Sequence, residues 1–205
     1  SDPILEENGI SYTRPNTSPS TSLQVMDYLL PKENSRLRTA EVTHVMLHFT
    51  SNAYYKPEDP YQMEEVYELF KEYGVSAHYL IDREGAIYQL VKEDRVAFHA
   101  GKGTDLNFLD YQNSINEYSI GVELLAIGTI DEMSMLPKGH YERIPPHYIG
   151  YTEEQYSALK DLLADIVERY DKVLFTREQI IGHDEYAPVR KSDPGSLFDW
   201  SKIGF

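Results

Sequence analysis

Two histidines and an aspartate stand at or just after the ends of apolar segments, and all three side-chain types bind metal ions. His48 ends the apolar run at 42–50, His183 ends the run at 179–183, and Asp193 lies on the segment that follows. If both runs are strands that end at one sheet edge, a single ion can join the three side chains. Two imidazoles and a carboxylate suit zinc and leave the fourth tetrahedral position open for water. No HExxH or paired-cysteine pattern accompanies them, so a hydrogen-bonded core histidine remains the alternative for His48.

Glu123 is the one charged residue in the apolar run at 118–128. An ionisable group in an apolar strand must find a partner or become neutral, because an unpaired buried charge costs several kcal/mol. Glu123 is therefore either a salt-bridged strand residue or part of a functional site.

The remaining pattern predicts the elements that must position these residues. The order is strand, helix, hairpin, strand, helix, strand, which favours an α/β fold: a single domain with a central mixed β-sheet flanked by helices. The expected segments are a buried strand at 42–50, a helix at 60–74, a hairpin at 76–91, a strand at 118–128, a loop at 129–151, a long helix that begins at the capping box 152–155, and a strand at 179–183. Before them we expect an irregular arm at 11–22 and a short helix at 23–30, so that residues 1–40 form an arm and 41–200 the core.

Composition excludes some classes of function. The formal net charge is −15 and the sequence pI is about 4.8, which disfavours nucleic acid as the main partner. The chain has no cysteine, and no run approaches the ~18 apolar residues of a membrane span. No signal-peptide pattern opens the sequence, but residue 1 is Ser and not Met, so the residues leave the compartment open.

Five blocks of the sequence together resemble a known family. They are "HVMLHFTSNA", "SAHYLIDREGAIYQLV", "AFHAGKG", "SIGVELLA" and "IIGHDEYAPVRKSDPG", and they extend from about residue 42 to 197. In order and approximate spacing they resemble the zinc-dependent N-acetylmuramoyl-L-alanine amidases, which are related to phage amidase-lysozymes and peptidoglycan recognition proteins. The resemblance implies an amidase fold and hydrolysis of the amide between N-acetylmuramic acid and the L-alanine of the stem peptide.

The resemblance also implies roles for particular residues. It makes His48, His183 and Asp193 the ligands of one Zn²⁺ per chain, with Asp193 where some relatives have cysteine. It makes Glu123 the group that accepts a proton from the attacking water, and Lys191 the cation that stabilises the oxyanion. Without the resemblance, Lys191 would be read as a solvated lysine in a turn.

A second set of implied residues concerns the substrate. His99, Asn52 and Lys102 are expected to contact peptidoglycan, the implied partner. Some relatives carry a catalytic tyrosine before the histidine of the hairpin, but here Ala77 precedes His78. The resemblance further implies a monomer that is secreted or associated with a cell wall, of bacterial or phage origin.

Two other functions remain open from the sequence. The first is a recognition module that binds peptidoglycan without cutting it; the complete ligand set and Glu123 argue for the enzyme. The second is a zinc peptidase that cuts ordinary peptide bonds, which usually shows the HExxH motif that this sequence lacks.

Overall fold

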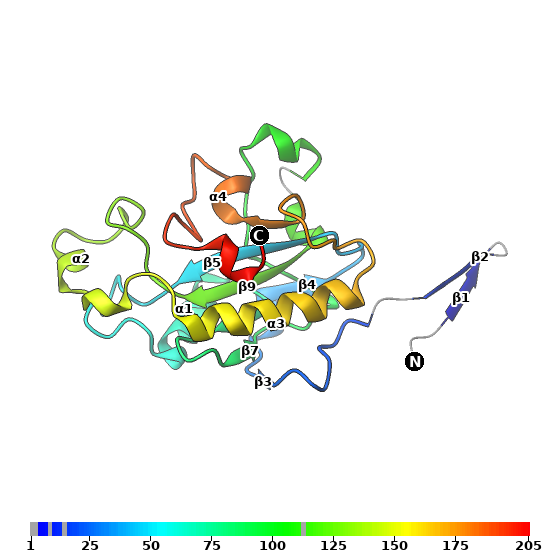
Figure 1. Cartoon of the computed structure of the whole chain (residues 1–205), viewed down its shortest axis with the longest axis horizontal. Helices are drawn as coiled ribbons and strands as arrows, with labels where there is room; N and C mark the ends of the chain where they lie inside the picture. Colours follow the sequence, from blue (N-terminus) through cyan, green and yellow to red (C-terminus); the bar gives the residue numbers. More distant parts are fainter. Residues whose placement is uncertain (1–3, 8–9, 14–15, 112–113) are drawn as a thin grey trace.

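The computed structural model describes residues 4–7, 10–13, 16–111 and 114–205. Residues 14 and 15 of the predicted arm lie outside these ranges. At the amino-terminal end, β1 (Ile4–Glu7) and β2 (Ile10–Thr13) pair as an antiparallel hairpin, which Figure 1 shows away from the main sheet.

The other elements follow the predicted order closely. The strands are β3 (Val25–Asp27), β4 (Ser35–Leu37), β5 (His44–Thr50), β6 (Tyr79–Ile81), β7 (Ile87–Gln89), β8 (Arg95–Ala97), β9 (Ser119–Leu125) and β10 (Ile180–Gly182). The α-helices are α1 (Met63–Tyr73), α2 (His140–Arg143), α3 (Glu153–Arg169) and α4 (His183–Tyr186). Short 3₁₀ turns lie at Lys32–Asn34, Leu106–Tyr111, Ile115–Tyr118, Pro146–Tyr148 and Trp200–Ile203.

The main sheet has six strands in the order β10-β5-β9-β6-β7-β3. The pairs β10–β5, β5–β9 and β9–β6 are parallel, whereas the pair β6–β7 is antiparallel. The predicted central mixed sheet flanked by helices is therefore confirmed (Figure 1). Among the described residues, the helices are too short or too polar to cross a membrane.

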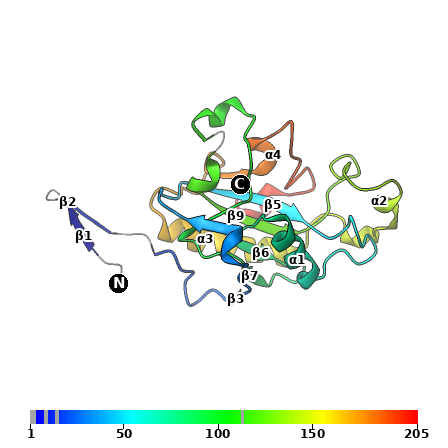
Figure 2. The same ribbon diagram turned by 180° about the vertical axis from the view of Figure 1, so that it is seen from behind.

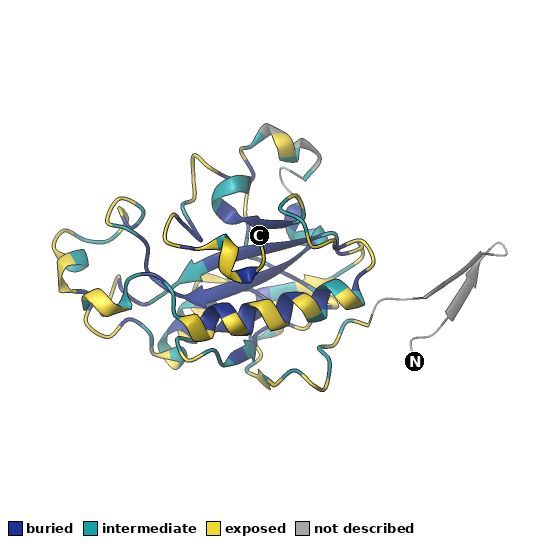
Figure 3. Cartoon of the chain, in the orientation of Figure 1, coloured by how far each residue is buried: buried dark blue, intermediate teal, exposed yellow. Residues whose placement is uncertain are grey.

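Helix α3 covers one face of the sheet, as Figure 1 shows. Its amino-terminal end is fixed by the predicted capping box, in which Thr152 Oγ1 accepts from Gln155 N at 3.1 Å and Gln155 Oε1 accepts from Thr152 N at 3.0 Å. Its apolar stripe appears as buried segments between exposed ones in Figure 3. The core on this face contains, among others, Val45, Leu47, Val122, Leu124, Leu159, Leu163 and Ile166. Odd-numbered residues of β5 and even-numbered residues of β9 therefore face α3.

The opposite face carries α1 near one end and α4 near the other. Val66 and Phe70 of α1 pack with Leu80, and Tyr186 of α4 packs in a cluster with Met46. Seen from behind in Figure 2, α1 lies in front of the sheet. The even-numbered residues of β5, His48 included, therefore point away from α3 and toward this second face.

Three predicted segments differ from the structure. Residues 11–13 of the predicted irregular arm belong to strand β2, and the predicted loop at 129–151 contains the helical turn α2. The predicted helix at 23–30 is wrong: Val25–Asp27 forms the edge strand β3, which pairs in parallel with β7. Its backbone groups find partners in the sheet, so tertiary pairing prevails over a short apolar pattern. The segment that follows β10 begins with a single helical turn, α4, which the sequence pattern did not indicate.

A buried carboxylate links the β7–β8 connection to α3. Glu93 is fully buried and accepts a two-pronged ion pair from Arg169, with nitrogen–oxygen distances of 2.7 and 2.9 Å. The hydroxyl of Tyr170 donates to the same carboxylate at 2.6 Å, and that of Tyr79 donates as well. The Arg169 guanidinium and the two hydroxyls all bond this one carboxylate, so they hold the β7–β8 connection and α3 together.

Replacing Arg169 by methionine should therefore destabilise the fold strongly. It leaves the Glu93 carboxylate buried without its cation, which costs about 3–5 kcal/mol of unfolding free energy. Urea unfolding followed by circular dichroism measures the change. Lys172→Met is the matched control, because Lys172 pairs with Glu41 on the exposed surface and its loss should leave the midpoint unchanged. A midpoint for Arg169→Met equal to that of the control would contradict the role given to this ion pair.

Candidate metal centre and active site

The register of the two central strands places His48 beside Glu123. Strands β5 and β9 are parallel, and His48 is the direct partner of Glu123 in the ladder. Direct partners in a parallel ladder point to the same face, which here is the face away from α3. A histidine and a glutamate that are 75 positions apart in the sequence thus meet near the carboxyl ends of their strands.

The third strand brings in the other two candidate ligands. Strand β10 pairs with β5 up to Gly182 opposite Leu47, so His183 emerges next to the end of β5. The chain then makes the turn of α4 and returns, and the backbone N–H of Asp184 donates to the carbonyl of Asp193 at 2.7 Å. This hydrogen bond fixes Asp193 beside the start of α4.

His48, His183 and Asp193 form a compact group of possible metal ligands, whose candidate atoms all lie within 4.8 Å of one another. The Nδ1 atoms of the two histidines are 3.1 Å apart. Asp193 Oδ2 lies 2.9 Å from His48 Nδ1 and 3.3 Å from His183 Nδ1. The structure therefore brings together the three residues that the sequence singled out, and their ligand atoms converge on one point.

The protonation states of this group suit a cation. Burial lowers the pKa of His48 to about 4, so its imidazole is neutral near pH 7. Burial alone would raise the pKa of Asp193, but the contacts of its carboxylate with His183 and His48 outweigh burial and hold the pKa well below the ordinary value. A neutral imidazole and an ionised carboxylate are the forms that bind metal ions.

Glu123 has an environment that disfavours its charge. Its side chain is buried, and Oε2 has no hydrogen-bond partner among the residues the structure describes. Burial raises the pKa of Glu123 well above its ordinary value, and the nearby Asp193 raises it further, while Lys191 lowers it. The salt-bridge alternative for Glu123 finds no support in the described contacts, because none joins its carboxylate to a cation. A carboxylic group with a perturbed pKa beside a candidate metal group has the features of a general acid or base.

Lys191 lies at the exposed side of this group. Its backbone N–H donates to Ala187 at 2.8 Å, and its side chain is open to solvent. The Lys191 charge lowers the pKa of both His48 and Glu123, so the ammonium acts on the same site.

Of the three predicted substrate contacts, His99 joins the metal group directly. Its Nδ1 lies 2.9 Å from His48 Nε2, and its Nε2 lies 2.9 Å from Ser119 Oγ. Both ring nitrogens thus have protein partners, and substrate contact through them finds no support in this arrangement.

Asn52 and Lys102 have no described contact with the metal group. Asn52 is buried, and its amide donates to Glu65 at 2.9 Å, which fastens the connection between β5 and α1. Lys102 is exposed, and its carbonyl accepts from Arg190. A role for either residue in substrate binding stays a prediction.

Three residues near the site were missed by reasoning from the sequence. Ser119 bonds His99, Asn116 accepts the N–H groups of residues 99 and 100, and Arg190 donates to the Ala100 carbonyl at 2.6 Å. Ser119 and Arg190 lie inside the resembling blocks, but nothing in their local pattern distinguishes them from ordinary surface or strand residues.

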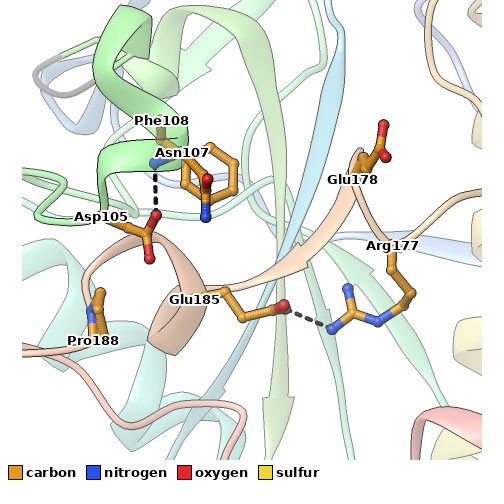
Figure 4. Close-up of a pocket in the computed structure, with 7 residues that line it drawn as sticks. All are labelled: Asp105, Asn107, Phe108, Arg177, Glu178, Glu185 and Pro188. Atoms are coloured by element: carbon orange, nitrogen blue, oxygen red, sulfur yellow. Dashed lines mark hydrogen bonds and ion pairs between the residues drawn. The ribbon is translucent and has the colours of Figure 1, made fainter.

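A separate pocket of about 570 Å³ is lined in part by Glu185 of α4 (Figure 4). Its lining is Asp105, Asn107, Phe108, Arg177, Glu178, Glu185 and Pro188, and Arg177 pairs with Glu185 at 2.6 Å. None of the candidate ligands lines it. The chemistry that the metal group allows is therefore not located in this pocket.

Comparison with known proteins identifies relatives along most of the sequence. The N-acetylmuramoyl-L-alanine amidase family matches residues 38–196. The 1,6-anhydro-N-acetylmuramyl-L-alanine amidase AmpD of Haemophilus influenzae is 34% identical over 138 residues, which make up 67% of this chain and 59% of that protein. The present chain thus spans somewhat more than half of the length of this relative.

Solved structures agree with this assignment of the fold. A crystal structure of a selenomethionine AmpD derivative superposes with a TM-score of 0.62 at 25% identity, over 87% of this chain and 92% of that chain. The amidase AmiD from E. coli, solved in complex with the substrate anhydro-N-acetylmuramic acid-L-Ala-D-gamma-Glu-L-Lys, superposes with a TM-score of 0.56 at 22% identity, over 98% of this chain and 64% of that chain. The second likeness shows a shared fold.

Proposed function

Because this chain belongs to the N-acetylmuramoyl-L-alanine amidase family, we propose that it hydrolyses the amide bond between N-acetylmuramic acid and the L-alanine of a peptidoglycan stem peptide. The observation that carries the proposal is the convergence of His48 Nδ1, His183 Nδ1 and Asp193 Oδ2 beside Glu123. A recognition module without hydrolysis needs no such group next to a buried carboxylic acid.

The donor set fits a zinc ion. Zinc in catalytic sites takes three protein ligands, usually histidines and a carboxylate, at about 2.0–2.2 Å. Ligand atoms at such distances in a tetrahedron lie about 3.3–3.6 Å from one another, so the observed separations of 2.9–3.3 Å need to widen only slightly to hold the ion. A zinc ion held by His48, His183 and Asp193 supplies Lewis-acid activation of water and of the scissile carbonyl.

Glu123 and Lys191 have separate tasks in this mechanism. Glu123 accepts a proton from the attacking water and returns it to the departing alanine amine, because its carboxylate lies beside the ligand group, next to His48 in the ladder. Lys191 donates a hydrogen bond to the oxyanion that develops on the carbonyl oxygen. Its exposed position supports this role, because a solvent-exposed ammonium is accessible to bound substrate.

Replacing Lys191 by methionine should lower kcat and leave KM nearly unchanged. The ammonium interacts with charge that develops in the transition state, and loss of one such donor costs about 10²–10³ in kcat. Steady-state kinetics on a purified muropeptide measure the split. Lys160→Met is the matched control, since Lys160 is exposed on α3, which covers the opposite face of the sheet, and the variant should retain kcat. A Lys191→Met enzyme that changed KM alone would assign this lysine to substrate binding.

The substrate and location belong to the same proposal. The names of the similar AmpD proteins suggest 1,6-anhydro muropeptides, and the AmiD complex contains such a compound. The net charge of −15 does not favour adsorption to anionic wall polymers, so small muropeptide fragments suit this chain better than intact wall. We propose a bacterial or phage protein that meets peptidoglycan or its fragments as a monomer, outside the cell or at the wall.

Mass analysis of products tests the proposed reaction. Anhydro-muropeptides and intact sacculi are incubated separately with the protein, with and without a chelator. We expect a free stem peptide with an amino-terminal alanine and an intact sugar, formed faster from the fragments and abolished by the chelator. Binding of either substrate without any cleavage would instead support the recognition module.

A further inference from the structure

The outer nitrogens of both candidate histidine ligands contact two consecutive residues. His48 Nε2 lies 2.9 Å from His99 Nδ1, and His183 Nε2 lies 2.7 Å from the carbonyl oxygen of Ala100. We propose that the His99–Ala100 dipeptide positions both ligands by fixing their rings in the Nε2–H form, so that both Nδ1 atoms face Asp193. This inference rests on the proposed role of His48 and His183 as metal ligands.

The Ala100 carbonyl determines the form of His183. A carbonyl oxygen accepts and never donates, so the proton of a neutral His183 ring is on Nε2. Its Nδ1 then has a free lone pair, and this is the atom that lies 3.3 Å from Asp193 Oδ2. The second hydrogen bond of a ligand ring sets which nitrogen meets the ion.

His99 performs the same task for His48 through a short chain of hydrogen bonds. For His48 Nδ1 to bind an ion, His48 Nε2 must carry the proton and donate it to His99 Nδ1. The His99 ring then carries its own proton on Nε2 and donates to Ser119 Oγ at 2.9 Å. Ser119 is fully buried, and its hydroxyl can accept this bond. Glycine at position 121 makes room for the ring, because a Cβ there would lie 2.6 Å from His99 Cγ.

The dipeptide itself is held in place from two sides. Asn116 Oδ1 accepts the backbone N–H of His99 at 3.3 Å and that of Ala100 at 3.0 Å. On the other side the Arg190 guanidinium donates to the Ala100 carbonyl at 2.6 Å and to the Lys102 carbonyl at 2.9 Å. Groups this well fixed lose little freedom when an ion binds, which is the condition for a preorganised site.

Three variants separate positioning from general damage to the fold. His99→Leu removes the acceptor for His48. His99→Asn keeps an acceptor, since its Oδ1 can take the place of the ring Nδ1. Arg190→Met removes an exposed guanidinium from the Ala100 carbonyl without touching the core. His147→Leu is the matched control, because His147 is exposed and lies on the connection before α3.

Zinc affinity is measured by competition with a chromophoric chelator, on protein whose fold is checked by circular dichroism. We expect His99→Leu to weaken binding by about 10–100-fold, the usual cost of losing an outer partner of a ligand. We expect Arg190→Met to weaken it by a smaller factor, and His99→Asn to recover most of the affinity. The control should bind zinc like the wild type. Long-range ¹H–¹⁵N spectra of the zinc-loaded wild type should show His48, His99 and His183 as Nε2–H forms.

The outcomes distinguish this inference from the proposed function. A wild type that binds no zinc refutes the ligand group itself. A wild type that binds zinc, with His99→Leu binding it equally tightly, refutes the positioning role alone. An Nδ1–H form of His99 in the zinc-loaded protein also refutes the positioning role, as does a folded His99→Asn variant no better than His99→Leu.

Discussion

Replacing Glu123 by glutamine is expected to lower kcat by about 10²–10⁴, the usual contribution of a positioned general base. Glutamine has nearly the same shape but cannot accept the proton of the attacking water. Zinc binding should remain, because Glu123 is not one of the three ligands in the compact group. Kinetics on a muropeptide, together with elemental analysis of the same sample, separate these effects. A Glu123→Gln enzyme with wild-type kcat would contradict the role given to this residue.

The Glu123→Gln substitution should also stabilise the fold once a chelator has removed the metal. This effect tests the environment of Glu123 independently of activity. Its raised pKa means that the neutral form is favoured in the folded chain. The neutral Glu123 side chain therefore contributes to the free energy of unfolding. This contribution is fully present below the ordinary pKa of 4.5 and is lost as pH rises through the raised pKa. Glutamine cannot ionise, so the variant avoids this loss and should be more stable than the parent protein at the higher pH. Thermal unfolding should show a gain at pH 8 and little change at pH 4; equal gains would contradict the pKa argument.

Replacing Asp193 by asparagine should abolish both metal binding and activity. The change removes the one anionic ligand and leaves two imidazoles. Losing an outer partner of a ligand already costs about 10–100-fold in affinity, so loss of a ligand should cost more than about 100-fold. Chelator competition measures the affinity, and product release at a fixed low zinc concentration measures the activity.

Asp184→Asn is the matched control for that experiment. Asp184 is a half-buried carboxyl on the turn of α4, and burial raises its pKa to about 6. It is not part of the metal group, so its amide variant should bind zinc and turn over substrate like the wild type. Parallel losses in both variants would show that the turn tolerates no such change, and His183→Gln would then be needed to test the ligand set.

Much of the fold followed from periodicity and capping in the sequence. The apolar run at 42–50, the capping box at Thr152 and the hairpin around Gly85 each have a local signal, and each forms the expected element. The predicted helix at 23–30 was wrong because the short apolar pattern there does not reveal that residues 25–27 pair with β7. The family resemblance is confirmed by the match over residues 38–196.

The candidate site was predictable in its residue types and less so in its geometry. Parallel pairing of β5 with β9 and β10 determines that His48, Glu123 and His183 meet, and no local pattern encodes that register. The contacts of His99 and Asn52 depend on side chains brought in from distant segments, Ser119 and Glu65 among them. Their sequence neighbourhoods could suggest an exposed contact but could not reveal these partners.

The most direct test is a titration of zinc into chelator-treated protein, with amide cleavage of an anhydro-muropeptide followed at each step. The proposed site predicts no cleavage without zinc, a linear rise as zinc is added, and a sharp end to the rise at one zinc per chain. Cleavage that is undiminished after complete removal of the metal, or a chain that binds no zinc at all, would contradict it.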